Sequence, residues 1–373
     1  MLTILYDGWS LVRQPNSPAA LHLLALLLHS PPEARALVAL PGLPPPWLSE
    51  AALWLPHSAS IHIQPTPDSD SARLIWEQRT LSKLVRELDA DLLHLISATP
   101  SLFSPPVTVV SPAEYGAGQD EKPAGPVARL RDALAQGGMA RVRGLLWPAD
   151  LPAPTPSSPI YTLPPLVHPA FLRQSAPLPG DDSALELPET YILYHGPQSP
   201  RALRRLLAAW SWAAGSIGTY YPLLLLSWDS PRREQFSALL EEYQLGETVR
   251  VLPPMPPEAA AALYRGCTAL FQPAPISIWG EPVRLALASA KPVVAVESLL
   301  ADALVGPAAY LVPVDAGDPG AARALGAALI TVVVEENVSE ELSKAARQRA
   351  TAWRNAGFAQ HLLEVYQAVL SAA

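Results

Sequence analysis

The sequence has a single cysteine, Cys267, among its 373 residues. One cysteine excludes an internal disulfide and any metal cluster held by several cysteines. It lies in the helical phrase LYRGCTALF, where a small buried apolar residue is the expected role rather than a nucleophile. Long hydrophobic runs are also missing, since none approaches the roughly 18 consecutive apolar residues that a membrane span needs. The longest candidate, residues 19–28, is interrupted by His22. We therefore expect no membrane span.

Charge is scarce and of the wrong sign for nucleic-acid binding. Charged residues make up 16% of the chain, the formal net charge is −8, and only four of the 26 basic residues are lysines. An acidic chain repels a phosphate backbone, so nucleic acid is not an expected partner. The opening MLTILYDG lacks the basic stretch and the cleavage site of a signal peptide, and a cytoplasmic location is the expectation.

Apolar runs alternate with helical patterns along the first half of the chain. Strands are predicted at residues 2–6, 36–40, 91–96, 107–110 and 160–163, and helices at residues 18–29 and 72–88. Strands separated by helices indicate a parallel sheet that is covered on both faces.

The same alternation restarts after a stretch rich in proline, glycine and acid, residues 174–188. Strands are predicted at residues 191–194, 223–226, 249–252, 269–272 and 292–296, with helices at 201–214, 232–243, 257–265, 282–290, 320–334 and 340–370. The predicted fold class is α/β, with two Rossmann-like doubly wound domains that face a cleft. The expected domains are residues 1–173 and 189–357, joined by a linker at 174–188, with a final helix at 358–373 that packs back on the first domain.

Phrases of both halves resemble family-4 (group 1) retaining glycosyltransferases. Residues 277–294, SIWGEPVRLALASAKPVV, are similar to the donor-site loop and helix of that family, and residues 192–210, ILYHGPQSPRALRRLLAAW, to its phosphate-binding strand, turn and helix. Residues 74–110 and 160–171 resemble its acceptor-domain phrases. The resemblance implies the GT-B fold and a nucleotide-sugar as the ligand. It implies no metal ion and no other cofactor, and the sequence contains no DxD-like metal motif.

The donor site departs from the family pattern. The resemblance places Ser277 and Leu285 where the family has two glutamates, one near the donor sugar and one on the nucleotide ribose. A leucine cannot accept the ribose hydrogen bonds, and each such group left unpaired on burial costs about 1–3 kcal/mol. The family's basic pair is replaced by Pro197 and Ala202, which leaves Arg201 as the nearest cation.

Several residues remain as candidates for a site. The resemblance implies that nucleotide and donor are bound by six positions: Gly196, Arg201, Leu252, Ser277, Gly280 and Leu285. Glu281 is the carboxylate of the predicted donor loop and the candidate catalytic residue, and an exposed charge on the rim of that loop is the alternative. His195 and His94 end or lie within strands, where each is either a ligand contact or a packed histidine. Asp7 ends the first strand, and a structural turn is the expected role there.

Two hypotheses of function follow. The first is transfer of a sugar from a nucleotide-sugar donor to an unknown acceptor. The second is a catalytically inactive GT-B homologue that acts as a scaffold or regulatory partner of an active glycosyltransferase, because both glutamates and the basic pair are lost together. A dinucleotide oxidoreductase is disfavoured, because no G-x-G-x-x-G follows any predicted strand. The sequence therefore leaves open whether the protein is an enzyme.

Overall fold

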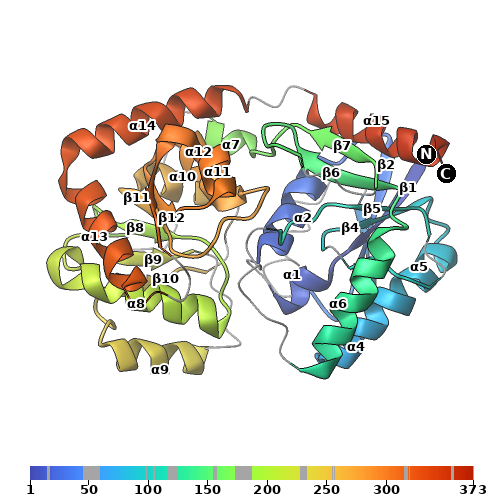
Figure 1. Cartoon of the computed structure of the whole chain (residues 1–373), viewed down its shortest axis with the longest axis horizontal. Helices are drawn as coiled ribbons and strands as arrows, with labels where there is room; N and C mark the ends of the chain where they lie inside the picture. The colour runs from blue at the N-terminus through green and yellow to red at the C-terminus, as the bar shows by residue number, and fades with distance from the viewer. Residues whose placement is uncertain are drawn as a thin grey trace. The chain divides into compact units, whose positions relative to one another are not determined.

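The structure is a computed structural model, and it describes residues 1–14, 17–44, 59–97, 99–103, 106–115, 125–153, 158–172, 187–226, 233–253, 255, 257–314, 318, 320–353 and 357–372. The chain divides into two compact units (Figure 1). The first unit comprises Met1–Leu166, Ser277–Trp279 and Asn355–Ala373, and the second comprises Val167–Ile276 and Gly280–Arg354.

The first unit is built on a seven-stranded sheet in the order β3-β2-β1-β4-β5-β6-β7. Every paired strand runs parallel to its neighbour. The central strands are buried on both faces, which explains why they read as unbroken apolar runs in the sequence. The strands are β1 (Leu2–Asp7), β2 (Ala34–Leu40), β3 (Ala59–Ile63), β4 (Leu92–Leu95), β5 (Thr108–Val110), β6 (Gly144–Pro148) and β7 (Ile160–Leu163).

Helices connect these strands: α1 (Trp9–Arg13), α2 (Pro18–Leu28), α4 (Asp70–Ile75), α5 (Leu81–Glu87) and α6 (Pro126–Met139). α2 begins where the Ser17 hydroxyl accepts a hydrogen bond from the backbone N–H of Ala20 at 3.2 Å. The helix predicted as one piece over residues 72–88 contains a π-helical turn, Trp76–Thr80, between α4 and α5.

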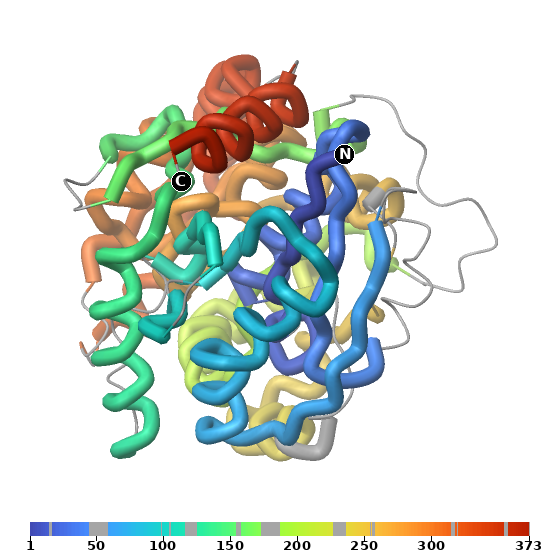
Figure 2. Tube along the Cα trace, turned by 90° about the vertical axis from the view of Figure 1, so that its right-hand side faces the viewer, coloured from blue at the N-terminus to red at the C-terminus, as the bar shows by residue number. Residues whose placement is uncertain are grey.

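The last helix, α15 (Phe358–Ser371), belongs to the first unit and packs against β7. Figures 1 and 2 show it, in red, beside the amino-terminal strand, so that the two chain termini lie close together. The prediction of continuous helix over residues 340–370 is wrong, because α14 (Glu336–Thr351) ends before Gly357. The φ of Gly357 is +103°, a conformation that glycine adopts at no steric cost and that breaks a helix.

The second unit is built on a six-stranded parallel sheet in the order β10-β9-β8-β11-β12-β13. This is the doubly wound arrangement. From β8 the chain adds β9 and β10 on one side, and it then returns to add β11, β12 and β13 on the other side of β8. The strands are β8 (Ile192–Tyr194), β9 (Leu223–Leu225), β10 (Val249–Val251), β11 (Ala269–Gln272), β12 (Val293–Val296) and β13 (Ala309–Val312).

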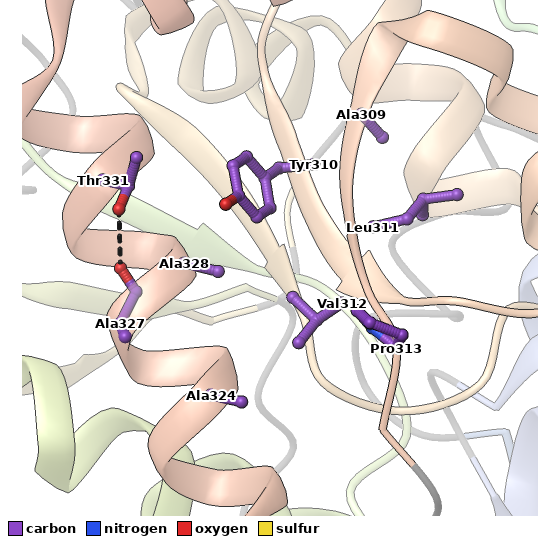
Figure 3. Close-up of a pocket in the computed structure, with 9 residues that line it drawn as sticks. All are labelled: Ala309, Tyr310, Leu311, Val312, Pro313, Ala324, Ala327, Ala328 and Thr331. Atoms are coloured by element: carbon purple, nitrogen blue, oxygen red, sulfur yellow. Dashed lines mark hydrogen bonds between the residues drawn. The ribbon is translucent and has the colours of Figure 1, made fainter.

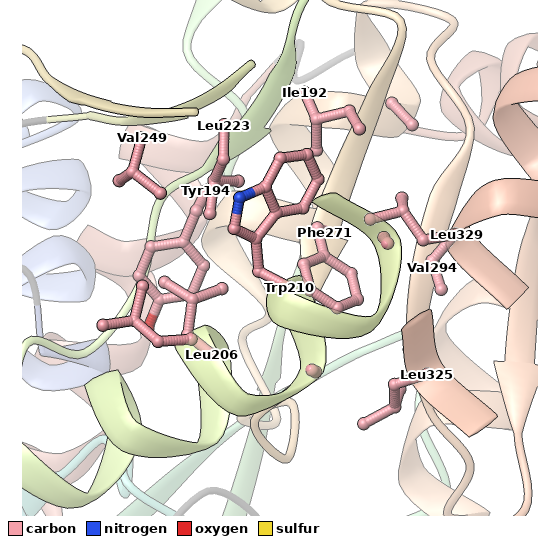
Figure 4. Packing of buried hydrophobic residues seen from close by; sticks show 14 of the residues in the cluster. Ile192, Tyr194, Leu206, Trp210, Leu223, Val249, Phe271, Val294, Leu325 and Leu329 are labelled. Carbon is pink, nitrogen blue, oxygen red and sulfur yellow. The ribbon is translucent and has the colours of Figure 1, made fainter. Parts of the chain in front are cut away.

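One face of this sheet is covered by α8 (Pro200–Ile217) and α13 (Ala321–Val334), which pack on each other. Trp210 of α8 lies in the centre of that core, against side chains of β8, β11 and α13 (Figure 4). The other α-helices described in the second unit are α7 (Pro169–Leu172), α9 (Arg233–Tyr243), α10 (Pro257–Gly266), α11 (Glu281–Ala288), α12 (Leu299–Val305) and α14.

The first segment of the first unit ends at Leu166, and α7, which belongs to the second unit, packs on α10 and α11. The predicted linker, residues 174–188, lies mostly outside the described residues, so those domain limits stay a proposal. Within the part of the chain that is described, no helix combines the length and the apolar character that a membrane crossing requires.

Candidate functional site

The second sheet reverses its strand order between β8 and β11. In an open parallel sheet, ligands bind outside the carboxyl ends of the strands at such a switch point. The register pairs Ala269 with Ile192 and Leu270 with Leu193. Gln272 is the last residue of β11 and His195 is the residue after β8, so both lie at the carboxyl ends of these neighbouring strands.

His195 and Gln272 are both buried, with 6% and 5% of their surfaces exposed. Side chains alternate between the faces of a strand. Tyr194 and Phe271 point into the core formed with α8 and α13. His195 and Gln272, one residue further along, therefore lie on the opposite face of the sheet.

Tyr264 of α10 fixes the orientation of the imidazole. Its hydroxyl lies 2.9 Å from Nδ1 of His195. Burial lowers the pKa of His195 to about 4, so the ring is neutral at pH 7. The phenol has no other hydrogen-bond partner among the described residues, so it satisfies its buried proton by donating to Nδ1. In this tautomer Nε2 carries the ring proton.

Two buried polar atoms at the switch point are left without a hydrogen bond. Within the described part of the chain, neither Nε2 of His195 nor Oε1 of Gln272 has a hydrogen-bond partner. An unsatisfied buried donor or acceptor costs about 1–3 kcal/mol, and more than nine in ten buried polar groups avoid it. What distinguishes these two atoms is that both lie at the carboxyl ends of strands at the switch point.

Glu281 is not on the rim of a loop, as the sequence analysis allowed, because it is the first residue of α11 and is only 5% exposed. The left-handed φ of Gly280, +55°, turns the chain into this helix, and a Cβ there would lie 2.4 Å from Cδ1 of Leu304. A carboxylate in the first turn interacts favourably with the helix dipole.

A buried arginine on α11 was missed in the sequence. Arg284 is fully buried, and its guanidinium lies over the ring of Trp353 at 4.8 Å. Arg349 approaches the same ring at 5.9 Å and donates hydrogen bonds to the backbone carbonyls of Ala303 and Leu304. The only indication in the sequence that Arg284 is buried was its place among the apolar residues of an amphipathic helix.

The other predicted positions are distributed as follows. Gly196 lies two residues after the end of β8 and next to the Tyr194 phenol, which donates to the Pro197 carbonyl at 2.6 Å. Leu252 is buried at the end of β10, and Arg201 is exposed in the first turn of α8. Leu285 is half-buried on α11. The buried Ser277 groups with the first unit rather than with these residues.

Several other polar residues have structural roles. Arg204 pairs with Glu242 at 3.0 Å on the surface. Cys267 is buried, and burial raises the pKa of its thiol to about 12, which makes it unreactive. In the first unit, Oδ1 of Asp7 accepts hydrogen bonds from Nε1 of Trp76 and from the backbone N–H of Trp9. No group of three His, Cys, Asp or Glu side chains within the described ranges could hold a metal ion.

A pocket of about 460 Å³ lies elsewhere in the second unit, between the edge strand β13 and α13 (Figure 3). Its lining is mostly small and apolar, and the hydroxyl of Thr331 already donates to the Ala327 carbonyl at 3.1 Å. None of the predicted site residues lines it. We therefore take the switch point, and not this pocket, as the candidate site.

No protein-family model and no curated protein matches the chain. Solved structures do match it over its whole length. Sucrose-phosphate synthase from Thermosynechococcus elongatus is similar with a TM-score of 0.68 and 17% identity, covering 100% of both chains. The chain has the GT-B fold. WaaG, a glycosyltransferase involved in lipopolysaccharide biosynthesis, has a TM-score of 0.70 and 14% identity over 97% of this chain and 99% of its own. Anabaena HepE in complex with UDP and glucose has a TM-score of 0.67 and 14% identity, and the match covers 99% of this chain and 100% of HepE.

The fold class predicted from the sequence, α/β with two Rossmann-like doubly wound units, is thereby confirmed. The resemblance to glycosyltransferases is confirmed at the level of the GT-B fold. In GT-B terms, the site described above belongs to the carboxyl-terminal of the two Rossmann-like units.

Proposed function

We propose that this protein is a glycosyltransferase that moves a sugar from a nucleotide-sugar, bound by the second unit, to an acceptor. One observation carries the proposal. Three buried polar side chains of the second unit lie where β8 and β11 end and where α11 begins: His195, Gln272 and Glu281. Polar groups gathered at the switch point of an otherwise apolar sheet favour a polar ligand there.

The likeness to known structures supports a nucleotide-sugar as that ligand. HepE, whose fold this chain shares, was solved with UDP and glucose and also with UDP-glucose. Two helices of the second unit, α8 and α11, begin just after β8 and β11. Free N–H groups at a helix start attract phosphate, so we assign the diphosphate to these two starts. Gly196, Gly280 and the exposed Arg201 lie in this region, and Leu252 and Leu285 complete the proposed nucleotide site.

The finer assignments belong to the same proposal. A family-4 retaining enzyme is the form that the sequence resembles, with the departing diphosphate stabilised by the helix starts and Arg201. Glu281 is the proposed carboxylate near the donor sugar, in place of the family glutamate that is Ser277 here. A cytoplasmic location is part of this proposal as well.

A transfer assay tests the proposal. The purified chain is incubated with UDP-, GDP- and ADP-sugars and a panel of hydroxyl acceptors, and release of the nucleoside diphosphate is followed. Acceptor-dependent release supports transfer. If no nucleotide-sugar is bound and no nucleoside diphosphate is released, the proposal fails, and the alternative is an inactive homologue that partners an active glycosyltransferase.

A further inference from the structure

We propose that His195 and Gln272 bind a hydroxyl group of the donor sugar, and that together they select the sugar rather than the nucleotide. This inference rests on the proposed function and extends it, because neither residue is among the nucleotide and donor positions expected from the sequence.

The pair provides a donor and an acceptor at the carboxyl ends of two neighbouring strands. With the Tyr264 hydroxyl donating to Nδ1, Nε2 of His195 is an N–H donor. Oε1 of Gln272, on the neighbouring strand, is an acceptor, and both atoms lack a partner within the described residues. A group placed between them must accept one hydrogen bond and donate another.

A hydroxyl meets this requirement and a phosphate does not. A hydroxyl has one donor and two acceptor lone pairs, so it satisfies both atoms at once. A phosphate oxygen only accepts, and it would leave Oε1 of Gln272 buried and unsatisfied. The imidazole is also neutral at pH 7, so it offers a dianionic diphosphate no charge. Sugars present several hydroxyls, and a nucleotide-sugar places them next to the diphosphate.

His94 in the first unit shows what a purely structural histidine looks like in this protein. It is fully buried on β4, and both of its ring nitrogens are paired, Nδ1 with the Tyr366 hydroxyl at 2.7 Å and Nε2 with the Ser111 hydroxyl at 2.8 Å. His195 has one nitrogen paired in the same way and the other unsatisfied. This difference points to a ligand that supplies the hydrogen-bond partner of Nε2 of His195.

Both atoms are shielded from solvent in the unliganded chain. A sugar reaches them only after a local rearrangement. The segment that follows Gln272, residues 273–280, connects β11 to α11, and it is the segment that we expect to move.

Two variants test the assignment, with a third as control. His195→Asn keeps an atom near the position of Nδ1 for the Tyr264 hydroxyl but removes Nε2. Gln272→Met keeps the length and removes the carboxamide. Ser289→Ala is the matched control, since the Ser289 hydroxyl is another buried atom without a partner in the described chain but lies at the far end of α11. Each variant is titrated calorimetrically with the nucleotide-sugar that wild type binds best, UDP-glucose being the first probe, and with its nucleoside diphosphate alone.

We expect each of the two variants to weaken nucleotide-sugar binding about tenfold and to leave nucleoside diphosphate binding within about twofold. Without ligand, the midpoint of thermal unfolding of each variant should equal or exceed that of wild type, because an unsatisfied buried group has been removed. An equal loss for both ligands would overturn the sugar assignment in favour of the phosphates, and no loss for either would overturn the site. If wild type binds no nucleotide-sugar, the proposed function fails first, which is a separate result.

Discussion

The hydroxyl of Tyr366 lies 2.7 Å from Nδ1 of His94, and this contact joins the last helix of the chain to the centre of the first sheet. The Tyr6 hydroxyl lies 3.0 Å from that of Tyr366, and the Ser111 hydroxyl 2.8 Å from Nε2 of His94. Four side chains from β1, β4, α15 and the residue after β5 thus form one buried network. Because every member is paired, the network stabilises the docking of α15.

Removing one hydroxyl tests this network. Tyr366→Phe keeps the buried ring but leaves His94 and Tyr6 each short of a partner, so we expect a loss of about 2 kcal/mol in the free energy of unfolding. Thermal or urea unfolding measures it. Tyr220→Phe is the control, since Tyr220 is 75% exposed, and it should change stability by less than about 0.5 kcal/mol. An unchanged free energy of unfolding in Tyr366→Phe would contradict the stabilising role of the network.

Acid should weaken the fold through His195. Its pKa is about 4 in the folded chain, below the usual 6.5, so the unfolded chain binds more protons between these values. The contribution of the neutral imidazole to the free energy of unfolding is therefore fully present above pH 6.5, and it is lost as the pH falls toward 4. We expect His195 to contribute about 2 kcal/mol of destabilisation at pH 5 relative to pH 8.

The measurement is the difference in unfolding free energy between wild type and His195→Asn across this range. The variant should lose less stability on acidification. His361→Asn, at an exposed position of α15, serves as the control and should follow wild type. Parallel curves for wild type and His195→Asn would show that the imidazole does not titrate as its burial requires.

The sheet strands were predictable because parallel strands buried on both faces read as short apolar runs. Residues 269–272 are an example, observed as β11. Three strands were not predicted: the edge strands β3 and β13, whose side chains are mostly only partly buried, and β6, which is buried throughout. The π-turn at Trp76–Thr80 was also invisible, because it changes the hydrogen bonding of a helix without changing its apolar pattern.

The site was less predictable than the fold. His195 was a candidate from its place at the end of a strand, but Gln272 was not. They belong to one site because β8 and β11 are neighbours, although 74 residues lie between Tyr194 and Ala269 on the chain, and no local pattern reveals that strand pairing. The burial of Glu281 and Arg284 was missed for the same reason, since helix α11 reads as amphipathic whichever side is covered.

The carboxylate of Glu281 should matter for transfer if the proposed function holds. Glu281→Gln removes a charge placed in the first turn of α11, and we expect turnover to fall about 10²-fold. Stability should fall by about 1 kcal/mol, because a favourable charge at a helix start is lost. Glu258→Gln, at the exposed start of α10, is the control and should leave turnover unchanged. Unchanged turnover in Glu281→Gln would remove Glu281 from the site.

Restoring a family glutamate should strengthen nucleotide binding. Leu285 is half-buried on α11 and occupies the position that the resemblance assigns to the ribose. Leu285→Glu supplies a charge-assisted acceptor, which we expect to tighten nucleoside diphosphate binding about tenfold or more, whereas Leu285→Gln should gain less. Calorimetry compares the three proteins. An unchanged affinity in Leu285→Glu would place the ribose elsewhere.

The central claim, that the second unit binds a nucleotide-sugar, is tested most directly by calorimetric titration of the purified wild-type chain. We predict saturable binding of one nucleotide-sugar per chain, weaker than about 1 μM because the ribose carboxylate and the basic pair are replaced. Binding should be lost when the same titration is made against the sugar without its nucleotide. The absence of any saturable heat with UDP-, GDP- and ADP-sugars at millimolar concentration would contradict the claim.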